Sequence, residues 1–166
     1  MINIINWKHS KKQQEGVAII EMVITLPLII LIFTISGEVG MLLNKQTTLS
    51  KTVETGARFL TTNTLLGTGL VKISAEKIQQ TRNLILYGNL LGTGDILLTG
   101  MDATDINVQC TYGTKNSYCD KDNRLSPITV SATYDYTPMF GSLFNNVTGF
   151  NLFPIQLTAT SVIEPI

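Results

Sequence analysis

The sequence is poor in the side chains that many enzymes use for nucleophilic catalysis and metal binding. Its one histidine is His9, near the N-terminus, and its only cysteines are Cys110 and Cys119. A Ser-His or Cys-His nucleophile needs a histidine in the folded domain, and a structural zinc site needs four ligands. We therefore expect no catalytic site of this kind, no metal site and no cofactor.

Charge is also scarce, at 14% of residues against about 25% in an average soluble domain. Between Val17 and Gly37 the only ionisable residue is Glu21, and the apolar run from Val17 to Ile35 covers nineteen residues. A helix of that length is roughly 30 Å long, which is the thickness of a bilayer's hydrocarbon core. This predicts a transmembrane helix over residues 17–37. A cleaved secretory signal is the rival interpretation, although its apolar region is usually shorter and ends in small residues.

The charges are unevenly distributed although the formal net charge is zero. The first sixteen residues carry Lys8, Lys11 and Lys12 against Glu15, which leaves nine basic and eleven acidic residues in the rest of the chain. Basic residues beside a membrane helix stay on the cytoplasmic side, so we expect a cytoplasmic N-terminus and an external C-terminal domain. No basic stripe indicates a nucleic-acid partner.

Two residues of the predicted anchor are unusual for a plain membrane helix. Glu21 places a carboxylate where its cost is about 2.5–3.5 kcal/mol on insertion scales, and Pro27 removes a backbone donor and tends to kink a helix. Each has an ordinary explanation, since an acid near the membrane edge can reach the interface and prolines are tolerated in membrane helices. Together with Gly16, which directly precedes the apolar run, they form a more specific pattern than either residue alone.

The stretch Gly16-Val17-Ala18-Ile19-Ile20-Glu21 follows a short polar leader and resembles the class III signal of type IV prepilins. The resemblance implies that residues 1–16 are a leader and that a prepilin peptidase cuts between Gly16 and Val17. It also implies that Glu21 sets the register of assembly, by pairing with the new amine of a neighbouring subunit. A buried charge that is paired in this way fixes the position of its partner.

Further along, Leu26-Pro27, Glu38 and the signature Gly56-Ala57-Arg58 extend the resemblance. From Gly16 to Phe59 the chain is similar to the TadE-like family, the minor pseudopilins of the tight-adherence (Tad, or type IVc) pilus. This implies a bacterial inner-membrane protein. It also implies four kinds of partner: the prepilin peptidase, other major and minor pilins, the inner-membrane assembly platform and membrane lipid. Met22 departs from the pattern, because pilins of this group often carry an aromatic residue there.

The rest of the chain predicts a small α+β domain. The anchor is expected to continue as a helical stalk over residues 38–62, followed by an external domain over 63–166. Ser74 can cap a second helix that Gly88 ends. The period then changes to two, which predicts an antiparallel sheet of about three strands. The alternating apolar positions are Ile106, Val108, Cys110 and Tyr112, then Ile128, Val130, Ala132, Tyr134 and Tyr136, then Ile155, Leu157 and Ala159.

Cys110 and Cys119 enclose a loop of eight residues. In a domain outside the cytoplasm, two cysteines this close favour a disulfide, with free thiols as the alternative. The acidic pairs Asp102 with Asp105 and Asp120 with Asp122 offer carboxylates for acid–base work or calcium binding, but no complete calcium loop surrounds them. We interpret both pairs as polar turns.

These features predict a structural protein rather than an enzyme. The favoured function is a minor pseudopilin that helps initiate, cap or regulate a Tad pilus used in adhesion or secretion. The alternative from another class is an uncleaved single-pass membrane protein whose external domain is a binding module, for instance an adhesin. A pseudopilin of a type II secretion system is a weaker alternative, because those mature chains usually begin with an aromatic residue and not with a residue such as Val17.

Overall fold

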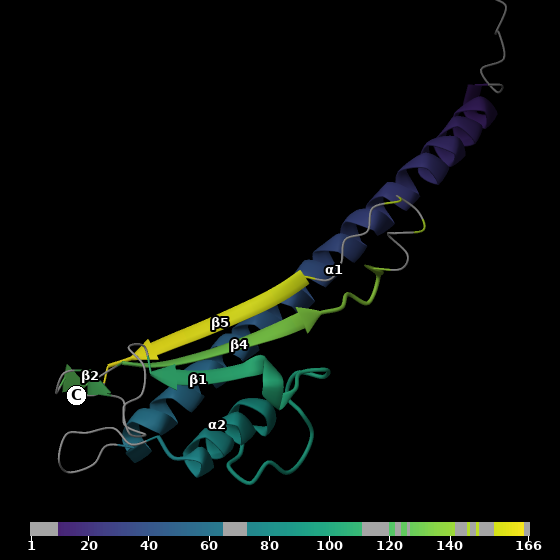
Figure 1. Ribbon diagram of the computed structural model, residues 1–166. Coiled ribbons are helices and arrows are strands. Elements are labelled where there is room, and N and C mark those ends of the chain that lie inside the picture. Colours follow the sequence, from purple (N-terminus) through teal and green to yellow (C-terminus); the bar gives the residue numbers. More distant parts are fainter. Residues whose placement is uncertain are drawn as a thin grey trace, which may run out of the picture. The chain divides into compact units, whose positions relative to one another are not determined.

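The computed structural model describes residues 10–64, 73–110, 120–121, 124–125, 127–141, 146, 149 and 155–164, with only the backbone described for 10–15, 120–121 and 124–125. The chain divides into two compact units, Met1–Gly40 and Met41–Ile166. The described residues include a long helix, a shorter second helix, three strands of one sheet, a two-stranded pair and a short 3-10 helix, so the predicted α+β class is confirmed (Figure 1).

Helix α1 spans Ser10–Thr64 and contributes to both units. It starts within the predicted leader and ends slightly beyond the predicted stalk. In its second half the residues that are fully or almost fully shielded from solvent follow the helical period: Leu49, Val53, Ala57 and Leu60. An apolar stripe along one face is typical of a helix that packs against a domain.

The main sheet has the order β1-β4-β5 and is antiparallel throughout. Strand β1 covers Ile106–Cys110, β4 covers Ile128–Tyr136 and β5 covers Ile155–Ile163. Strand β4 pairs with β5 over its whole length, from Ile128 opposite Ile163 to Tyr136 opposite Ile155. All five apolar positions of β4 are buried, as their alternation predicts.

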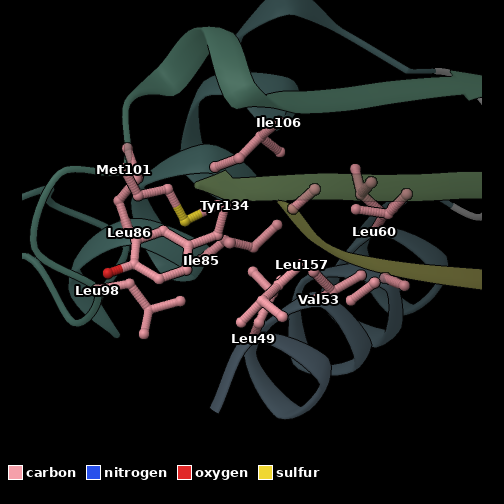
Figure 2. Close-up of a cluster of buried hydrophobic side chains, with 14 of the residues drawn as sticks. Leu49, Val53, Leu60, Ile85, Leu86, Leu98, Met101, Ile106, Tyr134 and Leu157 are labelled. Atoms are coloured by element: carbon pink, nitrogen blue, oxygen red, sulfur yellow. The ribbon is translucent and has the colours of Figure 1, made fainter. Parts of the chain in front are cut away.

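The core of the second unit lies between this sheet and the helices. Figure 2 shows side chains from α1, α2, the segment before β1 and the strands meeting in one cluster. The labelled members are Leu49, Val53 and Leu60 of α1, Ile85 and Leu86 of α2, Leu98, Met101, Ile106, Tyr134 and Leu157. The polar face of the sheet, which carries residues such as Asn107, Ser131 and Thr160, lies on the opposite side from these apolar residues.

Helix α2 spans Ala75–Tyr87, and both of its predicted ends are confirmed. The Ser74 hydroxyl accepts a hydrogen bond from the Lys77 amide, which satisfies one of the free donors of the first turn. Gly88 ends the helix in the left-handed conformation, with φ of 73°, and its amide donates to the Leu84 carbonyl. This is the one place in α2 where a glycine is required by the backbone.

The segment between β1 and β4 differs from the expected polar turn. Two short strands, β2 (Asp120–Lys121) and β3 (Arg124–Leu125), pair antiparallel there. Strands of two residues have too few side chains to show a period of two, so the sequence gives no signal for them. Asp122 and Tyr112 lie outside the described residues.

Asp102 and Asp105 have a structural role in the 3-10 helix η1, Ala103–Asp105. Asp102 Oδ1 accepts a hydrogen bond from the Ala103 amide at 2.6 Å, and the Asp102 amide donates to Asp105 Oδ2 at 2.8 Å. This reciprocal capping satisfies donors at the start of the turn. The interpretation of this pair as a polar turn therefore agrees with the structure.

Candidate membrane anchor and assembly site

The first half of α1 presents apolar side chains to its surroundings on nearly every side. The exposed large apolar residues run from Val17 to Ile35, and Phe33 is 75% exposed. Within the described residues, the part of α1 between Gly16 and Asn63 contains a stretch long and apolar enough to cross a membrane, with none of that stretch buried. A helix that is apolar all round is stable only when something apolar surrounds it. The structure therefore fits a membrane-anchored protein.

The hydroxyl side chains of this stretch are satisfied inside the helix. The hydroxyl of Thr25 donates to the Glu21 carbonyl at 2.9 Å. In the same way Thr34 donates to the Ile30 carbonyl and Ser36 to the Ile32 carbonyl, both at 2.8 Å. A hydroxyl that bonds back to the preceding turn exposes no unsatisfied donor to lipid. These three residues are thus compatible with a membrane environment.

Pro27 lies inside α1, and the helix continues without a break on both sides of it. Proline has no amide hydrogen, so the helical bond that residue 27 would donate to the Val23 carbonyl is missing. The predicted kink at this position stays a prediction.

Gly16, Val17 and Glu21 all lie on exposed helix. A Cβ atom added to Gly16 would meet nothing within 4 Å, so the packing of the chain does not require a glycine there. Val17 and Glu21 are four residues apart and share one face of the helix. None of the described residues forms a hydrogen bond or an ion pair with the Glu21 carboxylate. Their predicted roles in processing and assembly stay predictions.

Glu38 is half-buried, just before the end of the first unit. The two glycines that flank it, Gly37 and Gly40, resemble Gly16 in that an added Cβ would meet nothing within 4 Å. No close approach of another part of the described chain explains either glycine.

The signature Gly56-Ala57-Arg58 is divided between the core and the surface. An added Cβ on Gly56 would lie 2.8 Å from Ile85 Cγ1 and 3.2 Å from Thr81 Cγ2, so the glycine allows α1 and α2 to pack closely. Ala57 is fully buried. Two of the three residues are therefore explained by the packing of the second unit.

Arg58 projects away from this contact. Its guanidinium forms an ion pair with Glu54 at 2.6 Å, and both side chains are more than half exposed. An exposed pair of this spacing contributes only about 0.3–0.5 kcal/mol. The packing of the second unit thus explains why Gly56 and Ala57 are present. Arg58 contributes little to the stability of this fold.

Cys110 is buried at the end of β1. Cys119 lies outside the described residues, so the disulfide between them stays a prediction. A bridge across so short a loop would stabilise the domain by about 2–3 kcal/mol.

A hydrogen bond between α1 and the sheet was not predicted from the sequence. Gln46 Nε2 donates to the carbonyl of Thr158 in β5 at 3.2 Å, across 112 positions of the chain. Beside it, Ser50, Val53 and Glu54 of α1 and residues 158–161 of β5 line a groove of about 350 Å³. No local pattern signals a contact between residues this distant in sequence, and only the fold brings them together.

A comparison with protein families supports the interpretation of the N-terminal part. Residues 16–58 match the family model described as TadE-like protein, which confirms the resemblance seen in the sequence. This segment of 43 residues, out of 166, is TadE-like and is consistent with a protein of the Tad pilus system. It begins at the predicted processing site and ends at Arg58, so it contains the anchor and most of α1. No curated protein and no solved structure matches the chain.

Proposed function

We propose that this protein is a minor pseudopilin of a Tad (type IVc) pilus system. The observation that carries the proposal is the coincidence of two features: an exposed apolar helix, and a TadE-like match that begins at the residue where this helix becomes apolar. In this proposal the protein is first inserted in the inner membrane, where a prepilin peptidase cuts it. The mature protein then helps initiate, cap or regulate the pilus. Its partners are other pilins, the assembly platform and lipid, and it has no catalytic activity.

The orientation follows from the charges that flank the anchor. Three lysines precede it and only Glu15 opposes them, so the N-terminus stays in the cytoplasm and the second unit lies outside. The Gly16–Val17 bond is then at the cytoplasmic edge of the membrane, within reach of a membrane peptidase. Residues 1–16 leave as the leader.

Glu21 is the residue that we expect to guide assembly. A carboxylate in an apolar layer costs about 2.5–3.5 kcal/mol unless it has a partner, and its own chain offers none among the described residues. The amine that cutting creates on Val17 of a neighbouring subunit supplies an opposite charge. Pairing the two charges makes only one axial register favourable.

The processing site is tested by Gly16→Leu. Because nothing packs against Gly16, this substitution leaves the chain's own structure intact, and we expect the precursor to accumulate on a blot of membranes that contain the peptidase. Gly40→Leu is the matched control, since that position is equally open, and it should be processed like wild type. Normal cutting of the Gly16→Leu chain would contradict the proposed site.

The assembly role is tested by Glu21→Ala with Met22→Ala as its neighbouring control, both at exposed positions. We expect both variants to be processed, and Glu21→Ala alone to co-purify about tenfold less with partner pilins. That loss corresponds to about 1.4 kcal/mol of interaction. Recovery of partner pilins at wild-type levels would remove Glu21 from the proposal.

A further inference from the structure

The first half of the loop between α2 and η1 is held in place by two asparagine side chains. Asn89 Oδ1 accepts hydrogen bonds from the amides of Gly92 and Thr93, at 2.9 and 3.2 Å, and Asn89 Nδ2 donates to the Thr93 carbonyl at 2.6 Å. Asn83 of α2 donates to the Leu90 carbonyl at 3.1 Å. A surface that is ordered before binding loses little conformational entropy when a partner binds to it.

The second half of this loop is attached to the core. Leu98 and Met101 are almost fully buried, and the Met101 amide donates a hydrogen bond to the Leu98 carbonyl at 3.0 Å. Tyr134 of β4 donates to the Thr99 carbonyl at 3.2 Å. Figure 2 shows Leu98, Met101 and Tyr134 in the same cluster of core side chains. The loop is therefore a fixed part of the second unit.

An open hollow of about 620 Å³ lies beside this loop. The residues that line it are Tyr87, Gly94, Asp95, Ile96, Thr99 and Gly100. A Cβ atom added to Gly94 or Gly100 would meet nothing within 4 Å, so the space beside both glycines is open. Sites for small ligands usually have a volume of about 300–1,000 Å³. The hollow is thus large enough for one long side chain and parts of its neighbours.

The same loop exposes several large apolar side chains. Four of the eight residues from Leu90 to Leu97 are leucine or isoleucine, with exposed fractions from 38% to 83%. One of them, Ile96, forms part of the wall of the hollow. Single exposed apolar residues are ordinary, whereas a group of them in one place marks an interaction site.

The charge at the hollow is negative. Asp95 is the only charged side chain that lines it, and none of the described residues forms a hydrogen bond or an ion pair with its carboxylate. From residue 83 to residue 114 the chain has three aspartates, Asp95, Asp102 and Asp105, and no lysine or arginine. Arg82 precedes Tyr87 by five positions, which places the two side chains about 140° apart around α2. This charge favours a positively charged ligand over an anion.

The lining suits a lysine or arginine side chain. Such a side chain lays its methylene groups on apolar surface and keeps its charge at a polar end. In the hollow, Tyr87 and Ile96 supply the apolar surface and Asp95 supplies the opposite charge. We propose that this hollow binds a lysine or arginine side chain of a partner protein, whose flanking apolar residues cover the exposed leucines of the loop.

Two short peptides test the proposal on the full chain in a nonionic detergent. Acetyl-Leu-Lys-Leu-amide carries a basic side chain between two apolar residues, and acetyl-Leu-norleucine-Leu-amide carries an uncharged side chain of similar length. The backbone amide signals of Gly94 and Gly100 in an NMR spectrum report binding, because both glycines line the hollow. We expect the lysine peptide to shift both signals and to bind about fivefold more tightly than the norleucine peptide, which is the upper end for a solvent-exposed ion pair.

Asp95→Asn removes the charge and keeps the shape of the side chain. We expect both peptides to bind this variant with the affinity that the norleucine peptide has for the parent chain. Asp135→Asn is the matched control, because Asp135 is also exposed but lies on β4, where it accepts a hydrogen bond from Gln156. This control should keep the fivefold preference. Unchanged amide signals outside the loop confirm that each variant is folded, and the two peptides on the parent chain provide a test that needs no variant.

Three results would overturn the proposal. Equal affinity of the two peptides for the parent chain would show that the hollow does not recognise positive charge. A preference for lysine that persists in Asp95→Asn would place the recognition elsewhere, and unshifted signals of Gly94 and Gly100 at millimolar peptide would show that the hollow is not the binding site. The experiment involves no peptidase and no pilus, so its result is independent of whether the bond between Gly16 and Val17 is cut.

Discussion

Helix α1 has two halves that use apolar side chains in opposite ways. Before Gly40 they cover nearly the whole circumference and are exposed, whereas after Leu43 they are buried or half-buried, and most lie on the face of Leu49 and Val53 that packs into the core. The charges follow the same division, since Glu21 is the only ionisable residue from Val17 to Gly37 and Lys45, Lys51, Glu54 and Arg58 follow later. Among the described residues, the first half exposes its apolar side chains, whereas the second half buries most of them in the core.

The glycines show the same contrast. Gly56 is fixed by the close approach of Ile85 and Thr81, while nothing in the described chain lies near an added Cβ at Gly37 or Gly40. Glycine in a helix costs about 1 kcal/mol relative to alanine. At Gly56 the close packing of α2 against α1 offsets this loss of stability. At Gly37 and Gly40 no packing within the described residues offsets it.

The largest expected effect is on the free energy of unfolding, and it is measured by substituting one leucine in each half of α1. Leu49 is fully buried and Leu28 is 59% exposed on the same helix. We expect Leu49→Ala to lower the free energy of unfolding of the second unit by about 2–5 kcal/mol, because it leaves a cavity, and Leu28→Ala to leave it unchanged. Proteolysis of the full chain in detergent across a urea series measures both. Equal losses from the two variants would contradict the division of α1.

Overpacking a glycine should have a smaller effect in the same direction. Gly56→Leu forces a side chain into the contact with Ile85, and we expect a loss of about 1–3 kcal/mol in the stability of the second unit. Gly40→Leu meets open space and should cause no loss. The urea series applies here too, and a stable Gly56→Leu chain would show that α2 does not depend on this close approach.

The smallest effect concerns a polar group inside the second unit. Tyr134 donates a hydrogen bond to the Thr99 carbonyl at 3.2 Å, and burial raises the pKa of its hydroxyl. The unfolded chain therefore loses this proton first, so stability is complete below about pH 10 and falls as the pH rises through the pKa of the unfolded state. Tyr134→Phe should cost about 1 kcal/mol at neutral pH and reduce the loss above pH 10. An identical alkaline profile in both chains would contradict the burial of this hydroxyl.

The regular parts of the fold could be predicted because their signals are local. The apolar run from Val17, the cap of Ser74, the stop at Gly88 and the alternation in β4 each occupy a few neighbouring residues. The site at β5 could not be predicted, because Gln46 and Thr158 meet only after the sheet has formed on α1. The role of Gly56 also depends on a distant partner, Ile85, even though the signature itself is visible in the sequence.

The anchor itself was predictable for a further reason. Length and composition alone decide whether a helix can cross a membrane, and both can be read directly from the sequence. Processing at Gly16 and pairing by Glu21 depend on other molecules, and the structure of one chain tests neither. The family match, which starts at Gly16, strengthens the case for an experiment on that bond.

The most direct test of the proposed function is the N-terminal sequence and intact mass of the protein from membranes with and without the prepilin peptidase. The account predicts a chain that begins at Val17 when the peptidase is present and at Met1 when it is absent. A chain that begins at Met1 in both samples would contradict it and would favour an uncleaved anchor with an external binding domain. A chain cut beyond Gly37 would also contradict it, because the apolar run would then be a secretory signal.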